Sequence, residues 1–193
     1  MTVSYVALGA NLPGLTGEVA GTLDRALEML AERGIQVTRR SPWYRTPAMP
    51  VGSGPDFVNG AAALASDLAP AALLAVLHEV EAALGRERPA RWAPRVCDLD
   101  LIAVGEAVLP DPETQAAWMA LDRGRAQTVV PPRLILPHPR LQERAFVLVP
   151  LADIAPEWRH PILGQTAREL CDGLDAAALA EIRPLGAAAP SKA

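Results

Sequence analysis

Two aspartates, Asp98 and Asp100, lie within the most strongly β-prone segment of the chain, residues 96–104. Because side chains alternate between the faces of a strand, both carboxylates are expected on one face, with Cys97 and Leu99 on the other. Adjacent carboxylates repel and Asp is uncommon in strands, so the pair lowers stability unless a cation or donor neutralises it. Paired hard carboxylates suit Mg²⁺ that also carries substrate phosphates, although a half-exposed sheet would show the same pattern.

Four arginines, Arg86, Arg88, Arg91 and Arg95, precede this strand within ten residues. Guanidinium forks match phosphate oxygens, and the run lies between a predicted helix end and the aspartate strand, where a Mg²⁺-bound polyphosphate would lie. A solvated charged loop is the alternative interpretation. Together with the paired acids, the arginines favour phosphoryl-type transfer by positioning and charge neutralisation.

The composition excludes several classes of protein. The 193 residues are 50% hydrophobic with a net charge of −4, which is typical of a globular protein with no general attraction to nucleic acid or membranes. The only lysine is Lys192, so neither a P-loop nor a pyridoxal Schiff base lies in the body of the chain. Cys97 and Cys171 are too few for a thiolate zinc site or a disulfide framework. No export signal or membrane-spanning run is visible, so we expect a cytoplasmic protein.

The hydrophobic pattern predicts the elements that position these residues. Strands are predicted at 2–8, 35–44, 57–64 and 96–104, and helices at 19–30 and 70–84, with glycines at 34 and 85 that end them. A further turn at 105–106 leads back toward residues 107–109. The order β-α-β-β-α-β, with both helices on one face of an antiparallel sheet, describes a ferredoxin-like α+β sandwich.

We expect a single domain over residues 1–185, followed by a disordered tail at 186–193. Residues 110–133 are expected to form an insertion with a short helix near 113–122. The proline-rich remainder is expected to be irregular, apart from a last helix that begins at the capping-box sequence of Thr166. The Pro- and Gly-rich loop at 45–55 is long enough to indicate a functional loop.

Several short segments carry a more specific pattern: 5–12 (YVALGANL), 41–47 (SPWYRTP), 55–59 (PDFVN), 85–88 (GRER), 91–100 (RWAPRVCDLD), 137–138 (PH), 144–146 (RAF) and 150–156 (PLADIAP). In these segments, which run in family order over about residues 2–160, the chain resembles the 6-hydroxymethyl-7,8-dihydropterin pyrophosphokinase family of folate biosynthesis. Gly60 stands where the family commonly has Ala, and the region 110–133 is longer than usual.

The resemblance implies transfer of a pyrophosphoryl group from ATP to the pterin hydroxymethyl oxygen, with release of AMP. It implies that Asp98 and Asp100 hold two Mg²⁺ ions, and that Arg86 and Arg95 steady the charge that develops on the triphosphate. We expect Asp100 to be the nearest acceptor for the hydroxyl proton, so the candidate catalytic residues are Arg86, Arg95 and Asp100. The implied ATP contacts are Glu81, Arg86, Arg88, Trp92, Arg95, His138 and Arg144. The pterin would stack between Phe57 and Phe146, with its polar edge on Asn59, Thr46, Pro47 and Ala48. Such stacking and amide pairing suit a flat heteroaromatic ring, although core packing is the alternative for both phenylalanines.

Two other functions stay open from the sequence alone. A glycosyltransferase could use the two aspartates to hold a metal and a sugar nucleotide, but that class predicts a longer, doubly wound domain. A non-catalytic ferredoxin-like module would bind a nucleotide in a metal-dependent way without turnover. We expect an enzyme whose partners are ATP and a reduced pterin, and a monomer, because no heptad or large apolar stripe is visible.

Overall fold

A six-stranded antiparallel sheet forms the centre of the computed structural model, which describes residues 1–14, 16–48, 54–85 and 95–186. The strand order is β5-β1-β4-β3-β6, and β2 also pairs with β4. The strands are β1 (Thr2–Ala10), β2 (Gln36–Arg40), β3 (Tyr44–Thr46), β4 (Phe57–Ser66), β5 (Asp98–Val104) and β6 (Arg183–Pro184). The predicted ferredoxin-like α+β architecture is confirmed.

One face of the sheet is covered by the two predicted helices, α1 (Val19–Glu32) and α2 (Pro70–Ala83). Both end two residues before the glycines predicted to follow them, and Pro70 lies in the first turn of α2, where its missing N–H costs nothing. Their leucines pack on Val6, Leu8 and Leu64 of the sheet, in a core that excludes water.

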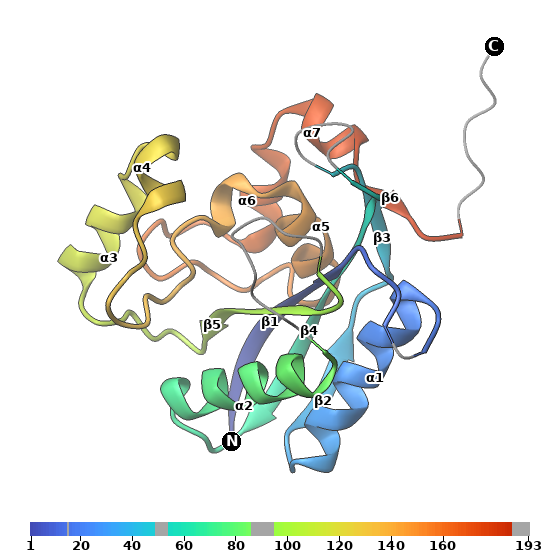
Figure 1. Ribbon diagram of the computed structural model, residues 1–193. Coiled ribbons are helices and arrows are strands. Elements are labelled where there is room, and N and C mark those ends of the chain that lie inside the picture. Colours follow the sequence, from blue (N-terminus) through green and yellow to red (C-terminus); the bar gives the residue numbers. More distant parts are fainter. Residues whose placement is uncertain (15, 49–53, 86–94, 187–193) are drawn as a thin grey trace.

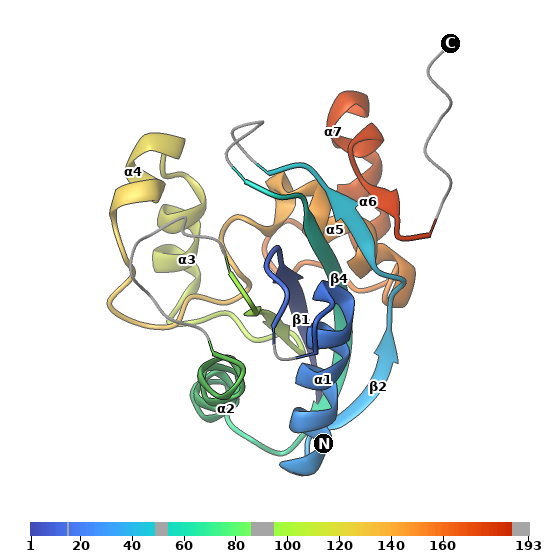
Figure 2. The same ribbon diagram turned by 45° about the vertical axis from the view of Figure 1, so that its right-hand side comes forward.

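The opposite face is covered by α5 (Ala145–Ile154) and α6 (Ala167–Asp172), with α7 (Ala176–Ala180) nearby (Figures 1 and 2). The two predicted helices therefore share one face, as expected. The second helical layer was not predicted, and the expectation of an irregular chain is wrong for the residues that form α5. The prediction missed α5 because Pro150 lies inside it, yet burial of its apolar side chains against β4 outweighs the lost helix hydrogen bond. The capping box at Thr166 is confirmed at the start of α6.

The segment predicted as one strand at 35–44 is divided into β2 and β3. Pro42 has no N–H for a ladder bond, and the Ser41 hydroxyl accepts a hydrogen bond of 3.0 Å from the Ala61 N–H. The Trp43 indole lies against Gly60, where an added Cβ would stand 2.5 Å from the ring. The interruption therefore buries Trp43 and starts a new strand that leads toward the 45–55 loop.

The region 110–133 forms α3 (Pro112–Met119) and α4 (Arg123–Thr128), followed by the short 3-10 helix η1 (Leu141–Glu143). Both helices stand beside the β5 edge of the sheet (Figure 1). The predicted helix near 113–122 is α3, capped by the Asp111 side chain. Residues 107–109 form no regular strand, since their ladder contact is a single bridge between Leu109 and Leu136. No helix in the described ranges has the length and apolar content needed to cross a bilayer.

Candidate active site

The two aspartates of β5 lie on the face of the sheet that α5 covers. Leu99, between them, is buried in the core beneath α1 and α2, so the predicted common face of Asp98 and Asp100 is confirmed. Asp98 forms an ion pair with Arg95, and Asp100 lies 3.7 Å from the Arg144 guanidinium. The Asp98 side chain is 19% exposed and the Asp100 side chain 41%, so both carboxylates are open to a ligand.

Across the sheet from Asp98 lies an amide on the same face. Gly9 of β1 is the cross-strand partner of both Asp98 on β5 and Asn59 on β4. The buried Asn59 amide donates a hydrogen bond of 2.7 Å to the Thr46 hydroxyl, which fixes its orientation. A Cβ at Gly9 would lie only 2.9 Å from Asn59 Oδ1. Backbone alone therefore forms the floor between the carboxylate and the amide.

Arg144 and Phe146 enter this face from the start of α5. The Arg144 guanidinium lies 5.7 Å from the centroid of the Phe146 ring and faces Asp100. Burial lowers the pKa of Arg144, and the Asp100 carboxylate partly offsets that shift. The guanidinium stays protonated at neutral pH, so the site carries a fixed positive charge beside the aspartates.

His138 lies in the turn before η1 and is held against β5. Its backbone N–H donates to the Ile102 carbonyl at 2.8 Å, and its ring Nδ1 accepts from the backbone N–H of Arg140 at 3.1 Å. Burial lowers the pKa of His138 to about 3, and the Arg144 charge acts in the same direction. The ring is therefore neutral at pH 7 and carries its proton on Nε2.

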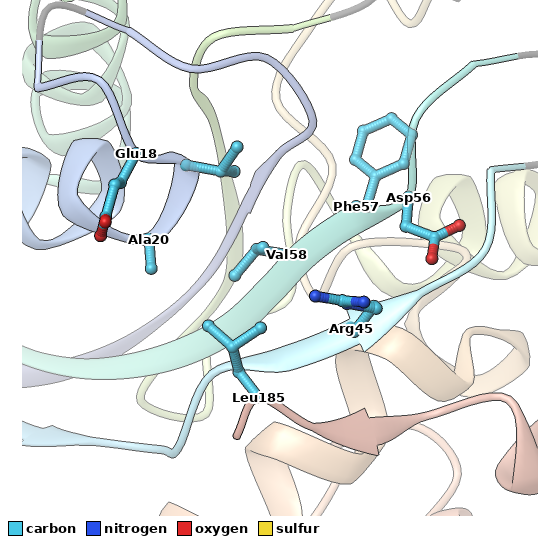
Figure 3. Close-up of a pocket in the computed structure, with 8 residues that line it drawn as sticks. Glu18, Ala20, Arg45, Asp56, Phe57, Val58 and Leu185 are labelled. Carbon is cyan, nitrogen blue, oxygen red and sulfur yellow. The ribbon is translucent and has the colours of Figure 1, made fainter. Parts of the chain in front are cut away.

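Phe57 begins β4 on the same face as Asn59 and is half-buried. It also lines a cavity of about 430 Å³ at the first turn of α1, together with Arg45, Val58 and Leu185 (Figure 3). Figure 3 shows the Phe57 ring pointing away from Leu185. Among the residues that line this cavity, Phe57 alone was predicted as a site residue. The open face of β5, β1 and β4 is therefore a better candidate for the active site than this cavity.

Glu81 occupies a different position from the other predicted ATP contacts. It is buried on α2, on the opposite side of β5, and its Oε1 accepts a hydrogen bond of 2.7 Å from the Leu99 N–H. Glu81 thus holds the strand between the two aspartates, and its contact with ATP stays a prediction. Pro47 and Ala48 follow β3 directly, whereas Arg86, Arg88 and Trp92 lie outside the described residues.

One residue that the sequence interpretation gave no role is Asn11. Its Oδ1 accepts from the Arg95 N–H at 2.8 Å, and its Nδ2 donates to the Pro55 carbonyl at 3.3 Å. This buried side chain joins Pro55, at the end of the 45–55 loop, to Arg95, three residues before β5. Hydrophobic periodicity does not single out Asn11. In the sequence, only its position within the segment 5–12 indicated that it could have a role.

A ferredoxin-like sheet that presents two carboxylates between guanidinium groups has the donors that an enzyme needs to transfer a phosphate-containing group. The family described as 7,8-dihydro-6-hydroxymethylpterin-pyrophosphokinase (HPPK) matches residues 5–156. The chain belongs to this family, and it is an ATP-dependent pyrophosphokinase of folate biosynthesis.

Relatives of this chain carry the name 2-amino-4-hydroxy-6-hydroxymethyldihydropteridine pyrophosphokinase. The protein from Methylorubrum extorquens is 42% identical over 176 residues, which are 91% of this chain and 95% of its own. The protein from Synechocystis sp. is 38% identical over 175 residues, 89% of this chain and 79% of its own.

Solved structures show the same fold at low sequence identity. The wild-type HPPK-DHPS of Plasmodium falciparum with pteroate superposes with a TM-score of 0.62 at 14% identity, covering 89% of this chain. The matched part is 42% of that longer chain, so this chain spans less than half of the two-part protein.

Proposed function

We propose that the sheet face bearing Asp98, Asp100 and Asn59 transfers pyrophosphate from ATP to the hydroxymethyl group of 6-hydroxymethyl-7,8-dihydropterin and releases AMP. The observation that carries this assignment is the position of the two carboxylates: they share one strand face and are flanked by the Arg95 and Arg144 guanidinium groups. Such an arrangement suits a metal-bound polyphosphate.

The donor set of the two aspartates fits Mg²⁺. Both are hard oxygen ligands and partly exposed, and Mg²⁺ is typically bound through one or two carboxylates while its other ligands are water and phosphate oxygens. Within the described ranges, no group of three or more His, Cys, Asp or Glu side chains could hold a metal by itself. Asp98 and Asp100 would hold two Mg²⁺ ions, whose chemistry is to neutralise phosphate charge and lower the pKa of the attacking hydroxyl.

The cationic and neutral donors around the aspartates would hold the triphosphate. Arg95 and Arg144 present guanidinium forks, and His138 presents a neutral Nε2–H donor at physiological pH. Arg95 would also stabilise the charge that develops during transfer. The proposed ATP contacts are completed by Arg86, Arg88 and Trp92. Glu81 holds β5 from the α2 side by accepting the hydrogen bond of the Leu99 N–H.

The pterin would bind on the Asn59 side of the face. The Asn59 amide offers both a donor and an acceptor, and Thr46 fixes its direction through their hydrogen bond. Phe57 and Phe146 would stack on the pterin ring, with the backbone of Pro47 and Ala48 beside its polar edge.

The reaction is an in-line attack. The hydroxymethyl oxygen forms a bond to the β-phosphorus of ATP, and the bond between that phosphorus and the oxygen bridging to the α-phosphorus breaks, so AMP leaves. Asp100 lies on this face with its carboxylate partly exposed, and it would be the nearest acceptor for the hydroxyl proton. The loops at 45–55 and 86–95 are expected to exclude water and so prevent hydrolysis of ATP; residues 49–53 and 86–94 of these loops lie outside the described part of the chain.

Product analysis tests this proposal. The protein is incubated with ATP, Mg²⁺ and 6-hydroxymethyl-7,8-dihydropterin, and nucleotides and pterins are separated chromatographically, with a control without pterin. Pterin-dependent AMP together with diphosphorylated pterin supports the proposal. ADP would place the attack at the γ-phosphorus, and Mg²⁺-dependent ATP binding without product would favour a non-catalytic nucleotide-binding module.

We also propose that residues 1–185 act as one domain and that the protein is a monomer. All six strands belong to one sheet, and the helices pack on its two faces, which supports a single domain. Size-exclusion chromatography with light scattering measures the mass directly, and the mass of a dimer would contradict the monomer.

A further inference from the structure

The helix α3 buries a polar side chain, Gln115, where the inserted segment 110–133 contacts the chain next to His138. Gln115 is 0% exposed and is the buried residue among the described side chains of α3. Its Nε2 donates a hydrogen bond of 3.1 Å to the Pro137 carbonyl, whereas its Oε1 has no partner among the described residues. A buried amide whose oxygen is unpaired costs stability, and simple packing would favour an apolar side chain there.

The contact that Gln115 makes lies directly before His138. The His138 N–H is fixed to the Ile102 carbonyl of β5, so the peptide group between Pro137 and His138 is held on both sides. Gln115 holds the carbonyl and β5 holds the N–H of the next residue. The position of the His138 backbone thus depends on α3 as well as on the sheet.

The insertion also contacts the residue that orients the His138 ring. Arg140 donates its backbone N–H to His138 Nδ1, and its Nη1 donates to the Leu121 carbonyl at 3.4 Å. Leu121 lies between α3 and α4 in the chain, so the second contact comes from the same inserted segment. Residues 110–133 therefore bind the chain on both sides of His138.

We propose that the inserted segment 110–133 is a support for His138, with Gln115 as the positioning residue that sets this histidine for the ATP phosphates. The inference rests on the proposed role of His138 in binding ATP. Gln115 acts through the Pro137 carbonyl and touches no substrate. Removing its donor leaves the charges of the site unchanged but loosens the backbone that carries the His138 ring.

The test uses Gln115→Met, which keeps the length and volume of the side chain and removes the donor. Glu113→Gln, an exposed change on the same helix, is the matched control. We expect Gln115→Met to raise the KM for ATP about 5- to 10-fold, the equivalent of one lost hydrogen bond, with a smaller change in kcat and none in the KM for pterin. The NMR signal of the His138 ring should also move in the ligand-free protein, and Glu113→Gln should change neither.

A double-mutant cycle with His138→Ala separates positioning from general destabilisation. If Gln115 acts through His138, adding Gln115→Met to His138→Ala causes no further rise in the KM for ATP. An equal rise in both backgrounds, or an unchanged ring signal in the single variant, would overturn the inference. If Gln115→Met does not fold, Gln115→Asn retains the amide but shortens it out of reach of Pro137, and the same readouts apply.

A different result would contradict the proposed role of His138 in ATP binding. If His138→Ala alone leaves the KM for ATP at its original value, His138 does not bind ATP and the proposed function loses that contact. The ring signal of Gln115→Met then still reports whether α3 positions the histidine.

Discussion

Substituting Gly9 with alanine places a methyl group on the floor of the proposed pterin site. The new Cβ would stand 2.9 Å from Asn59 Oδ1, closer than real Cβ contacts allow, so the amide must move. Asn59 is buried and held by its 2.7 Å hydrogen bond to Thr46, so a rotation of the amide away from the new Cβ would strain or break that bond. The substitution therefore acts on the residue proposed to read the polar edge of the pterin.

The expected magnitude follows from two opposing terms. Gly9 does not adopt a positive φ, so alanine would otherwise stabilise the protein by about 0.4–1 kcal/mol through the unfolded state. Losing a buried amide hydrogen bond costs about 1–3 kcal/mol. The cost outweighs the gain, and we expect a net loss of about 1 kcal/mol in the free energy of unfolding. The same displacement should weaken pterin binding about 5- to 150-fold.

The assay measures pterin binding by fluorescence titration with a non-hydrolysable ATP analogue present, and stability by urea unfolding. Asn59→Ala and the double variant with Gly9→Ala complete a cycle. If the steric contact is the cause, Gly9→Ala adds no stability cost once the Asn59 amide is absent. Additive costs, or unchanged pterin binding in Gly9→Ala, would refute the proposed floor between the carboxylate and the amide.

Three further predictions follow from the same structure. Asp100→Asn should lower kcat at least 100-fold while the unfolding midpoint changes little, because the residue is partly exposed, and an unchanged rate would remove its role as proton acceptor. Asn11→Ala removes the side-chain bonds to Arg95 and Pro55, so it should raise the KM values for both substrates several-fold and destabilise the protein by about 1–3 kcal/mol; steady-state kinetics and urea unfolding measure both effects. The pKa of the fully buried His160 is lowered to about 4, so the unfolded chain takes up a proton first as the pH falls, and this residue should contribute about 1 kcal/mol of stability loss between pH 6 and pH 5. His160→Gln should remove that contribution, and an unaltered pH dependence of urea unfolding would contradict it.

Local rules account for the parts of the fold that the sequence predicted. The apolar spacing of α1 and α2 and the capping box at Thr166 depend on neighbours within a few residues. The common face of Asp98 and Asp100 follows from the two-residue period of a strand, whatever lies around it. These features could be predicted from the sequence because no distant contact is needed to specify them.

Local rules failed where burial competes with propensity. Pro150 made 145–154 read as irregular, yet the apolar side chains of α5 gain more from packing on the small alanines of β4 than the helix loses at the proline. Pro42 acted in the opposite sense, since its missing N–H divided a segment that was predicted as one strand. The helix at Pro150 depended on the partner surface, which local periodicity does not report, whereas the break at Pro42 followed from a local property that the strand pattern outweighed in the prediction.

By itself, the sequence determined the chemistry that this protein has available: two carboxylates on one strand face, arginines before them, and no lysine in the body of the chain. The tertiary structure decided where that chemistry is assembled. It brought Arg144 to Asp100, placed Gly9 between Asp98 and Asn59, and set α3 behind His138. These contacts join residues that are tens of positions apart, so they exist only after strand register and helix packing have brought distant segments together.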